Sequence, residues 1–130
     1  MKYKVLICGG RKFYEYHTQE DAEDFIKSCL ISLLEPPEKE DVIFISGMAR
    51  GADQIPIKMV KDDDEWGGIE EYHADWDNLG RKAGPLRNIR MLEEGNPDMV
   101  IAFPDPESRG TWHMVDISRK ANKKVFIYED

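Results

Sequence analysis

Four short segments of this chain combine glycine with arginine, two residue types well suited to binding phosphate. They are Cys-Gly-Gly-Arg at 8–11, Ser-Gly-Met-Ala-Arg-Gly-Ala-Asp at 46–53, Gly-Pro-Leu-Arg-Asn at 84–88 and Phe-Pro-Asp-Pro-Glu-Ser-Arg-Gly-Thr at 103–111. Glycine lets the backbone approach an anion, helix N-termini present free N–H groups, and a guanidinium adds a forked donor. The chemistry that these segments indicate is the binding of an anion such as a phosphate.

The segment 46–53 carries the strongest of the four signals. Gly47 and Gly51 bracket a turn between an apolar run and an expected helix, whose free N–H groups would point at an anion. Arg50 is placed to clamp that anion. Asp53 has two interpretations, because it can cap the helix or accept hydrogen bonds from ribose hydroxyls or a base.

The segment at Gly9, Gly10 and Arg11 follows the first apolar run. It is not the G-x-G-x-x-G of dinucleotide-binding folds, and no P-loop pattern occurs in the chain. Two interpretations stand, a tight turn at the end of a strand and a phosphate contact. The arginine beside the glycines favours the phosphate contact.

The other two segments each begin a helix. Arg87 and Asn88 lie in an expected first helical turn, where a cation opposes the helix dipole unless an anion is near. Arg87 therefore contacts a ligand or pairs with one of the many acids of the chain. Gly110 and Thr111 supply N–H groups and a hydroxyl at another helix start. Trp76 covers the edge of the core or stacks on a base, and we favour the first.

Catalytic chemistry is less clearly encoded than binding. No cysteine–histidine cluster has metal-ligand spacing, and no nucleophile, base and orienting residue form a recognisable set. The acid–base candidates are Asp53, Glu107 and His113, although a lone histidine is more often structural. The acidic run at 62–65 is interpreted as a solvated cluster rather than a metal site.

Composition narrows the class of protein. The 130 residues carry a net charge of −8, which argues against a general nucleic-acid binder. The two cysteines, Cys8 and Cys29, are expected to be buried thiols in a reducing compartment. The chain starts with a strand rather than a signal segment and has no apolar run of about 18 residues, so we expect a cytoplasmic protein without a membrane partner.

The periodicity predicts five strands that alternate with four helices. The strands are expected at 3–8, 42–45, 69–74, 99–103 and 125–128, and the helices at 20–34, from about 52, at 86–94 and at 110–121. Thr18 is the expected N-cap of the first helix. This order predicts an α/β fold: one Rossmann-like, doubly wound domain over residues 1–130 with a mostly parallel five-stranded sheet. The strand order does not follow from the pattern.

Taken together, the segments resemble the SLOG superfamily, in particular its YspA/YpsA-type proteins. The matching residues are Gly-Gly-Arg after the first strand, Ser-Gly-x-Ala-Arg-Gly-Ala-Asp, Asp-Trp, Gly-Pro-x-Arg-Asn-x-x-Met and Phe-Pro followed by Arg-Gly-Thr. The resemblance extends from about residue 4 to 128. DprA (Smf) and the LOG phosphoribohydrolases belong to the same superfamily, and small proteins of this kind are similar to ones from bacteria and phages.

The resemblance implies a nucleotide or nucleotide-derived ligand at the glycine loops, with no further cofactor required. The residues that it implies for ligand binding are Gly9, Gly10, Arg11, Ser46, Gly47, Arg50, Gly51, Asp53, Arg87, Asn88, Gly110 and Thr111. LOG enzymes carry a glutamate for N-glycosidic cleavage after their glycine–threonine pair. Met114 takes its place here, and a thioether cannot supply the carboxylate.

Three functions remain open at this point. The first is a module that senses or sequesters a nucleotide-type small molecule. The second is an enzyme acting on a nucleoside N-glycosidic or phosphate linkage, with Glu107, Asp53 or His113 as acid–base groups. The third is DprA-like binding of single-stranded nucleic acid through Trp76, Trp112 and the loop arginines, which the overall charge disfavours. Related SLOG proteins often self-associate, so a homo-oligomer is expected.

Overall fold

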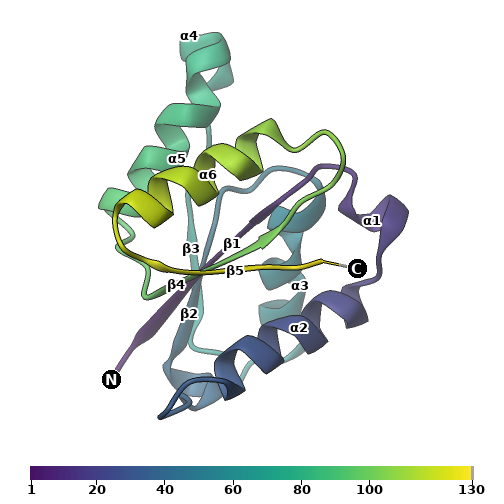
Figure 1. Ribbon diagram of the computed structural model, residues 1–130, viewed down its shortest axis with the longest axis vertical. Helices are drawn as coiled ribbons and strands as arrows, with labels where there is room; N and C mark the ends of the chain where they lie inside the picture. Colours follow the sequence, from purple (N-terminus) through teal and green to yellow (C-terminus); the bar gives the residue numbers. More distant parts are fainter. Residues whose placement is uncertain (130) are drawn as a thin grey trace.

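A five-stranded parallel sheet forms the centre of the protein (Figure 1). The computed structural model describes residues 1–129. The strands are β1 (Tyr3–Gly9), β2 (Val42–Ser46), β3 (Gly68–Glu71), β4 (Met99–Phe103) and β5 (Lys124–Ile127). They run in the order β3-β2-β1-β4-β5, and each pairs in parallel with its neighbour. The predicted α/β, Rossmann-like, doubly wound fold is confirmed, and the strand order is now known.

Helices cover both faces of this sheet. The longer ones are α2 (Gln19–Ile31), α3 (Ile55–Asp62), α5 (Ala83–Glu93) and α6 (Arg109–Lys120). The short ones are α1 (Phe13–Tyr16) and α4 (Trp76–Leu79), with 3-10 turns η1 (Lys39–Asp41), η2 (Gly51–Gln54) and η3 (Gly80–Lys82). Figure 1 shows α2 and α3 together on one side of the sheet and α5 and α6 together on the other.

The core has two apolar layers, one on each face of the sheet. Alternate residues of β1 point to opposite faces, so Val5 packs in the layer under α2 and α3, and Leu6 in the layer under α5 and α6. Cys8 belongs to the second layer and Cys29 to the first; both are buried, free thiols, as predicted. Burial raises the pKa of both thiols, which makes them poor nucleophiles.

Helix α2 begins as predicted and ends early. Thr18 is its N-cap, and its hydroxyl accepts the Asp21 N–H at 3.1 Å. The helix stops at Ile31 rather than 34, and Leu34 is fully exposed. The reason is Pro36, whose ring would clash with the carbonyl of Ser32 in a continuing helix.

The segment 75–84, expected as a loop, is largely helical. The Asp75 carboxylate accepts the Asn78 N–H at 3.3 Å and caps α4, which leads through η3 into α5. Helix α5 therefore begins at Ala83, three residues before the predicted start, with Pro85 in its first turn. Strand β3 ends at Glu71 rather than 74. The helix expected from about 52 starts as η2 and continues as α3.

The topology creates a crevice above β1. The chain leaves β1 toward β2 on one side, and β4 pairs with the other side of β1. At this reversal of strand order the loop after β1 leads to α2 on one face of the sheet and the loop after β4 leads to α6 on the other. The glycine and arginine segments of the sequence follow β1, β2 and β4 and begin α5, so the fold brings them to this edge.

Candidate functional site

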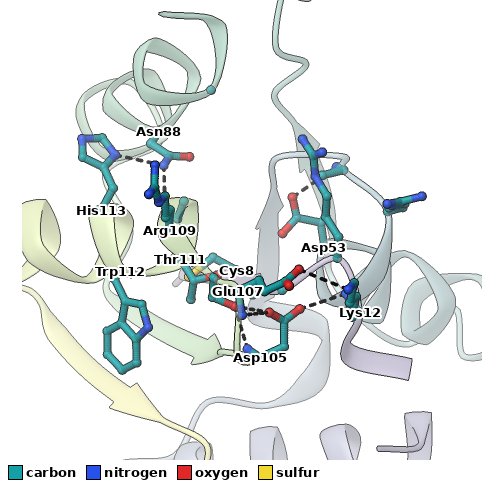
Figure 2. Close-up of a pocket in the computed structure, with 18 of the residues that line it drawn as sticks. Cys8, Lys12, Asp53, Asn88, Asp105, Glu107, Arg109, Thr111, Trp112 and His113 are labelled. Atoms are coloured by element: carbon teal, nitrogen blue, oxygen red, sulfur yellow. Dashed lines mark hydrogen bonds and ion pairs between the residues drawn. The ribbon is translucent and has the colours of Figure 1, made fainter. Parts of the chain in front are cut away.

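A cavity of about 1110 Å³ opens at the carboxyl edge of the sheet. Figure 2 shows side chains from the loops after β1, β2 and β4 and from the starts of α5 and α6 around it. Nine of the twelve predicted ligand residues line it: Gly9, Gly10, Arg11, Arg50, Asp53, Arg87, Asn88, Gly110 and Thr111. The three catalytic candidates, Asp53, Glu107 and His113, line it as well. Ser46, Gly47 and Gly51 lie outside the lining.

The charge of the cavity is opposite to that of the whole chain. Five cationic side chains line it, namely Arg11, Lys12, Arg50, Arg87 and Arg109, against the carboxylates of Asp53, Asp105 and Glu107. The chain as a whole has a net charge of −8. A local excess of cations in an acidic protein favours an anionic ligand at this place.

The loop after β2 uses its polar groups within itself. The buried Ser46 hydroxyl donates to the Asp53 carbonyl at 2.7 Å and accepts the Met48 N–H at 3.1 Å. The Ala49 N–H is bound by the Asp53 carboxylate at 3.1 Å, and the Gln54 amide donates to the Ala49 carbonyl at 2.9 Å. These bonds hold the loop in shape, and they leave the Met48 and Ala49 amides unavailable to a phosphate.

The glycines after β1 and β2 allow two loops to touch. The Gly10 N–H donates to the Phe103 carbonyl at 2.9 Å, and the Ala52 N–H donates to the Gly10 carbonyl at 3.0 Å. Gly51 has φ +82°, and a Cβ there would lie 2.3 Å from the Gly10 carbonyl oxygen. A Cβ on Gly9 would lie 2.4 Å from both Ala52 Cβ and the Phe103 carbonyl oxygen. Close packing therefore requires these glycines, whether or not an anion binds.

Asp53 lies buried at the base of the cavity, with 6 % of its surface exposed. Burial raises its pKa to about 6, and the nearby Arg87 and the Ala49 N–H only partly oppose that rise. It does not cap α3, because Gln54 occupies the N-cap position, so the capping interpretation is wrong. A carboxyl group with this pKa exchanges its proton near neutral pH.

Arg87, Asn88 and His113 form a hydrogen-bonded chain along one wall. The Arg87 guanidinium donates to the Gly47 carbonyl and, at 3.2 Å, to the Asn88 amide oxygen. This orients the Asn88 nitrogen toward the Gly110 carbonyl at 3.3 Å and His113 Nδ1 at 3.1 Å. An amide nitrogen only donates, so His113 Nδ1 accepts and the neutral imidazole carries its proton on Nε2. Burial lowers the pKa of Arg87, and Asp53 opposes that shift.

The N-terminus of α6 differs from the loop after β2. The N-cap, Ser108, makes no side-chain bond to the helix, and its hydroxyl binds Asp105 instead. A Cβ on Gly110 would meet nothing within 4 Å. Thr111 is 4 % exposed and lines the cavity, and among residues 1–129 no hydrogen bond to its hydroxyl is formed. Unlike the β2 loop, this helix start leaves polar groups and space available.

Asp105 joins two walls of the cavity, a role that the sequence analysis missed. Its carboxylate accepts the N–H groups of Lys12 at 2.9 Å and Glu107 at 2.8 Å and the Ser108 hydroxyl at 3.0 Å. Burial would raise its pKa, but these three hydrogen bonds outweigh it, and the pKa lies below the ordinary value. The Lys12 ammonium also pairs with Glu107 at 3.1 Å. The sequence signal that could have revealed this role is the Asp-x-x-Ser spacing, which is typical of turns stabilised by side chains.

Two half-exposed tryptophans stand at the cavity. Trp76 on α4 has the Arg11 guanidinium 5.7 Å from its ring centre and lies against Gly84, where a Cβ would be 3.2 Å from the ring. With 48 % of its surface exposed, it covers the start of α5 rather than the edge of the core. Trp112, 47 % exposed, projects from α6 away from His113 (Figure 2).

Met114, at the place of the LOG glutamate, is fully buried in the apolar layer under α5 and α6 and does not line the cavity. Its neighbour His113 does line the cavity, together with Thr111 and Trp112 of the same turn. Within residues 1–129, no group of three or more histidine, cysteine, aspartate or glutamate side chains is arranged to hold a metal ion. Over the same residues, none of the helices has the length and apolar character needed to cross a membrane.

Comparison with known proteins relates the chain to a phage protein. No family model matches the chain, and no solved structure matches it. A relative is the Gene 61 protein of Mycobacterium phage D29, which is 37% identical over 136 residues; the match covers 98% of this chain and 97% of the relative. This agrees with the expected likeness to phage proteins. With this identity over almost the whole of both chains, the protein belongs to the same family as the phage Gene 61 protein.

Proposed function

We propose that the protein binds a nucleotide or nucleotide-derived ligand in the cavity and acts as a sensor or a sequestering module, as expected of a SLOG-type protein. The phosphate lies against the first turn of α6. The observation that carries this is the side chain of Thr111, which lines the cavity at the start of α6 and whose hydroxyl forms no hydrogen bond in the described part of the chain. A hydroxyl that no other group of the protein engages is available to bind a phosphate oxygen.

Three further features support this position for the phosphate. The first amides of a helix have no partner within the helix, and the macrodipole favours an anion there. The open space over Gly110 lets an anion approach those amides. Arg50 and Arg109 are exposed, line the cavity and form no ion pair among residues 1–129, so both are available to a ligand.

A thermal-shift and calorimetric screen tests the proposal. The probes are nucleoside mono-, di- and triphosphates, cyclic nucleotides, NAD and ADP-ribose, each checked afterwards for product by mass spectrometry. At 100 times its dissociation constant a ligand adds about 2.7 kcal/mol to the free energy of unfolding, which gives a clear rise in Tm. A rise without product supports a sensor or sink. No rise with any probe would contradict the proposal.

Matched arginine variants show whether binding occurs in this cavity. The double substitution Arg50→Ala and Arg109→Ala removes two cations that hold no other part of the protein, so binding should weaken at least tenfold without loss of the fold. Arg87 is less suitable, because it also holds the Gly47 carbonyl. The control is Arg81→Ala, an exposed arginine outside the lining, which should leave the affinity unchanged.

A second candidate function, hydrolysis of a nucleoside N-glycosidic bond, is favoured by one observation. Asp53 lines the cavity, and its pKa of about 6 suits a group that gives and takes a proton near neutral pH. Under this alternative the screen yields a free base, and Asp53→Asn abolishes its formation while the ligand still binds. Product that persists in Asp53→Asn would exclude Asp53 as the acid–base group.

A further inference from the structure

A second, smaller hollow of about 320 Å³ adjoins the main cavity. It lies on the other side of the loop after β4, and it shares Asp105, Pro106 and Trp112 with the main cavity. Its remaining lining is Tyr16, His17 and Pro104. The two hollows are therefore neighbours, and Trp112 lines both of them.

The chemistry of this hollow is that of a site for a flat ring. Tyr16 and Trp112 are 58 % and 47 % exposed, although such large aromatic side chains are usually mostly buried. Prolines on both sides of Asp105 add rigid apolar walls. The volume of this hollow is at the small end of the range for ligand sites. It is adequate for the base of a nucleotide and too small for a whole nucleotide.

Trp112 is better placed than Trp76 to stack on a base. The ring of Trp76 already has the Arg11 guanidinium over it and Gly84 against its edge. For Trp112, no ring contact and no cation–π contact occurs within residues 1–129. Trp112 also directly follows Thr111, so the two neighbours on α6 face the two hollows.

We infer that the small hollow is the base site of the ligand, with a purine ring stacked on Trp112 and enclosed by Tyr16. This inference rests on the proposed function, since it takes the phosphate to lie at the first turn of α6. The ligand then bends around the loop after β4, with its phosphate in the cationic cavity and its base in the aromatic hollow. Nucleotides stack on exposed aromatic rings in this way in many proteins.

Two probes that differ only by the base test the inference. AMP and ribose 5-phosphate share the sugar phosphate, and their affinities are measured by calorimetry for the wild type and for Trp112→Ala. We expect Trp112→Ala to weaken AMP about 10- to 100-fold and to leave ribose 5-phosphate unchanged. Trp112→Phe keeps a ring and should stay within a few-fold of the wild type. Tyr16→Ala should weaken AMP by a smaller factor.

A spectroscopic measurement supplies an independent readout. Stacking of adenine on Trp112 should quench the tryptophan fluorescence of the wild type, whereas ribose 5-phosphate should not. In Trp112→Phe the quenching should disappear although AMP still binds. Ile31→Ala is the control, since Ile31 is 72 % exposed at the end of α2 and lies outside both hollows.

The two proposals fail in different ways. If AMP and ribose 5-phosphate both bind the wild type and Trp112→Ala equally, the base site is wrong and the phosphate site stands. If Trp76→Ala weakens AMP and Trp112→Ala does not, the base lies at α4 and the inference is overturned. If the wild type binds neither probe, the base site falls together with the phosphate site.

Discussion

The loops after β2 and β4 begin at the same edge of the sheet, on either side of β1. Both contain glycine, serine, arginine and aspartate. In the first, Ser46, Asp53 and the amides of Met48 and Ala49 bind one another. In the second, the polar groups of the first turn of α6 have space above them, and the Thr111 hydroxyl has no partner in the described chain. Similar residue types thus form a loop held by its own hydrogen bonds in one place and a helix start with unengaged polar groups in the other.

The comparison teaches that a glycine-rich segment is informative only when the partners of its backbone groups are known. The segment 46–53 has the more conspicuous sequence, yet Ser46, Gly47 and Gly51 lie outside the cavity lining. The segment 103–111, which carries the weaker sequence signal of the two, contributes seven consecutive residues, 105–111, to that lining. The contrast can be tested by equivalent substitutions in the two loops.

The largest effect is expected from alanine in place of the two contrasting glycines. Gly51→Ala places a Cβ on a residue with φ +82° and 2.3 Å from a backbone oxygen, so unfolding free energy should fall by about 3 kcal/mol or more. Gly110→Ala meets open space and should change stability by less than about 1 kcal/mol. It should instead weaken phosphate binding on the order of tenfold. Denaturation and calorimetry measure both; equal loss of stability would contradict the contrast.

The next effect is the pH dependence produced by Asp53. Its folded-state pKa of about 6 lies above the ordinary 3.8, so the folded protein holds this proton more tightly than the unfolded chain does. The resulting stability is fully present below pH 3.8 and is lost as pH rises through 6, with a total of up to about 3 kcal/mol. The Asp53→Asn variant does not undergo this pH-dependent loss. Its free energy of unfolding, relative to that of the wild type, should therefore rise between pH 4 and 7.

Asp105, in the loop after β4, has a pKa shift opposite in direction to that of Asp53 in the loop after β2. Its folded-state pKa lies below the ordinary value, so its contribution is present above that value and is lost as pH falls. Asp105→Asn should therefore lose stability relative to wild type at neutral pH and regain it in acid. Denaturation curves at a series of pH values measure both variants, and parallel profiles for the two would contradict the assigned shifts.

A smaller effect is expected from removing one hydroxyl in each loop. Ser46→Ala leaves the Met48 N–H and the Asp53 carbonyl without their buried partner, which should lower the unfolding free energy by about 1–3 kcal/mol. Thr111→Val removes a hydroxyl that has no partner among residues 1–129, so stability should hold or rise slightly while phosphate binding weakens. A large loss of stability in Thr111→Val would show that its hydroxyl is structural.

The smallest effect concerns the Lys12–Glu107 ion pair, which spans the two walls of the cavity at 3.1 Å. Glu107 is exposed and such pairs contribute little, so Glu107→Gln should not shift Tm measurably. It also removes a carboxylate from the cavity, and phosphate affinity should rise two- to threefold at low salt and return to the wild-type value at high salt. A Tm that falls clearly would mean that this pair holds the loop after β4.

Much of the fold could be predicted because apolar runs mark buried parallel strands. Those at 3–8, 42–45 and 99–103 lie within a residue of the observed strands. The strand order could not be predicted, because hydrophobic periodicity indicates which residues are buried and does not indicate which strands are adjacent in the sheet. Helix α1 was missed because four residues carry no period, and α4 because its cap, Asp75, begins a polar segment without an apolar stripe.

The sequence predicted which residues lie at the site. It did not predict which of their polar groups are hydrogen-bonded within the protein and which are free. Nine of the twelve ligand residues that the residue patterns and the SLOG resemblance indicate line the cavity. Whether an amide is free depends on partners distant in the chain, such as Lys12 and Asp105, whose hydrogen bond spans 93 positions. No local pattern encodes that bond. The same holds for Asn88 and His113, which meet only because α5 packs against α6.

The pairing of β1 with β4 has a consequence for the order of events during synthesis. Val5 lies opposite Met99, so this strand pair joins the first residues of the chain to the last third. Contacts so far apart form late, because a long segment must be ordered before they are made. A nascent chain can assemble β1, β2 and their helices on leaving the ribosome, but the cavity walls from α4, α5 and the loop after β4 are still missing. The cavity is complete only once α6 has emerged, so under the proposed function a ligand can assist the final folding step and not the early ones.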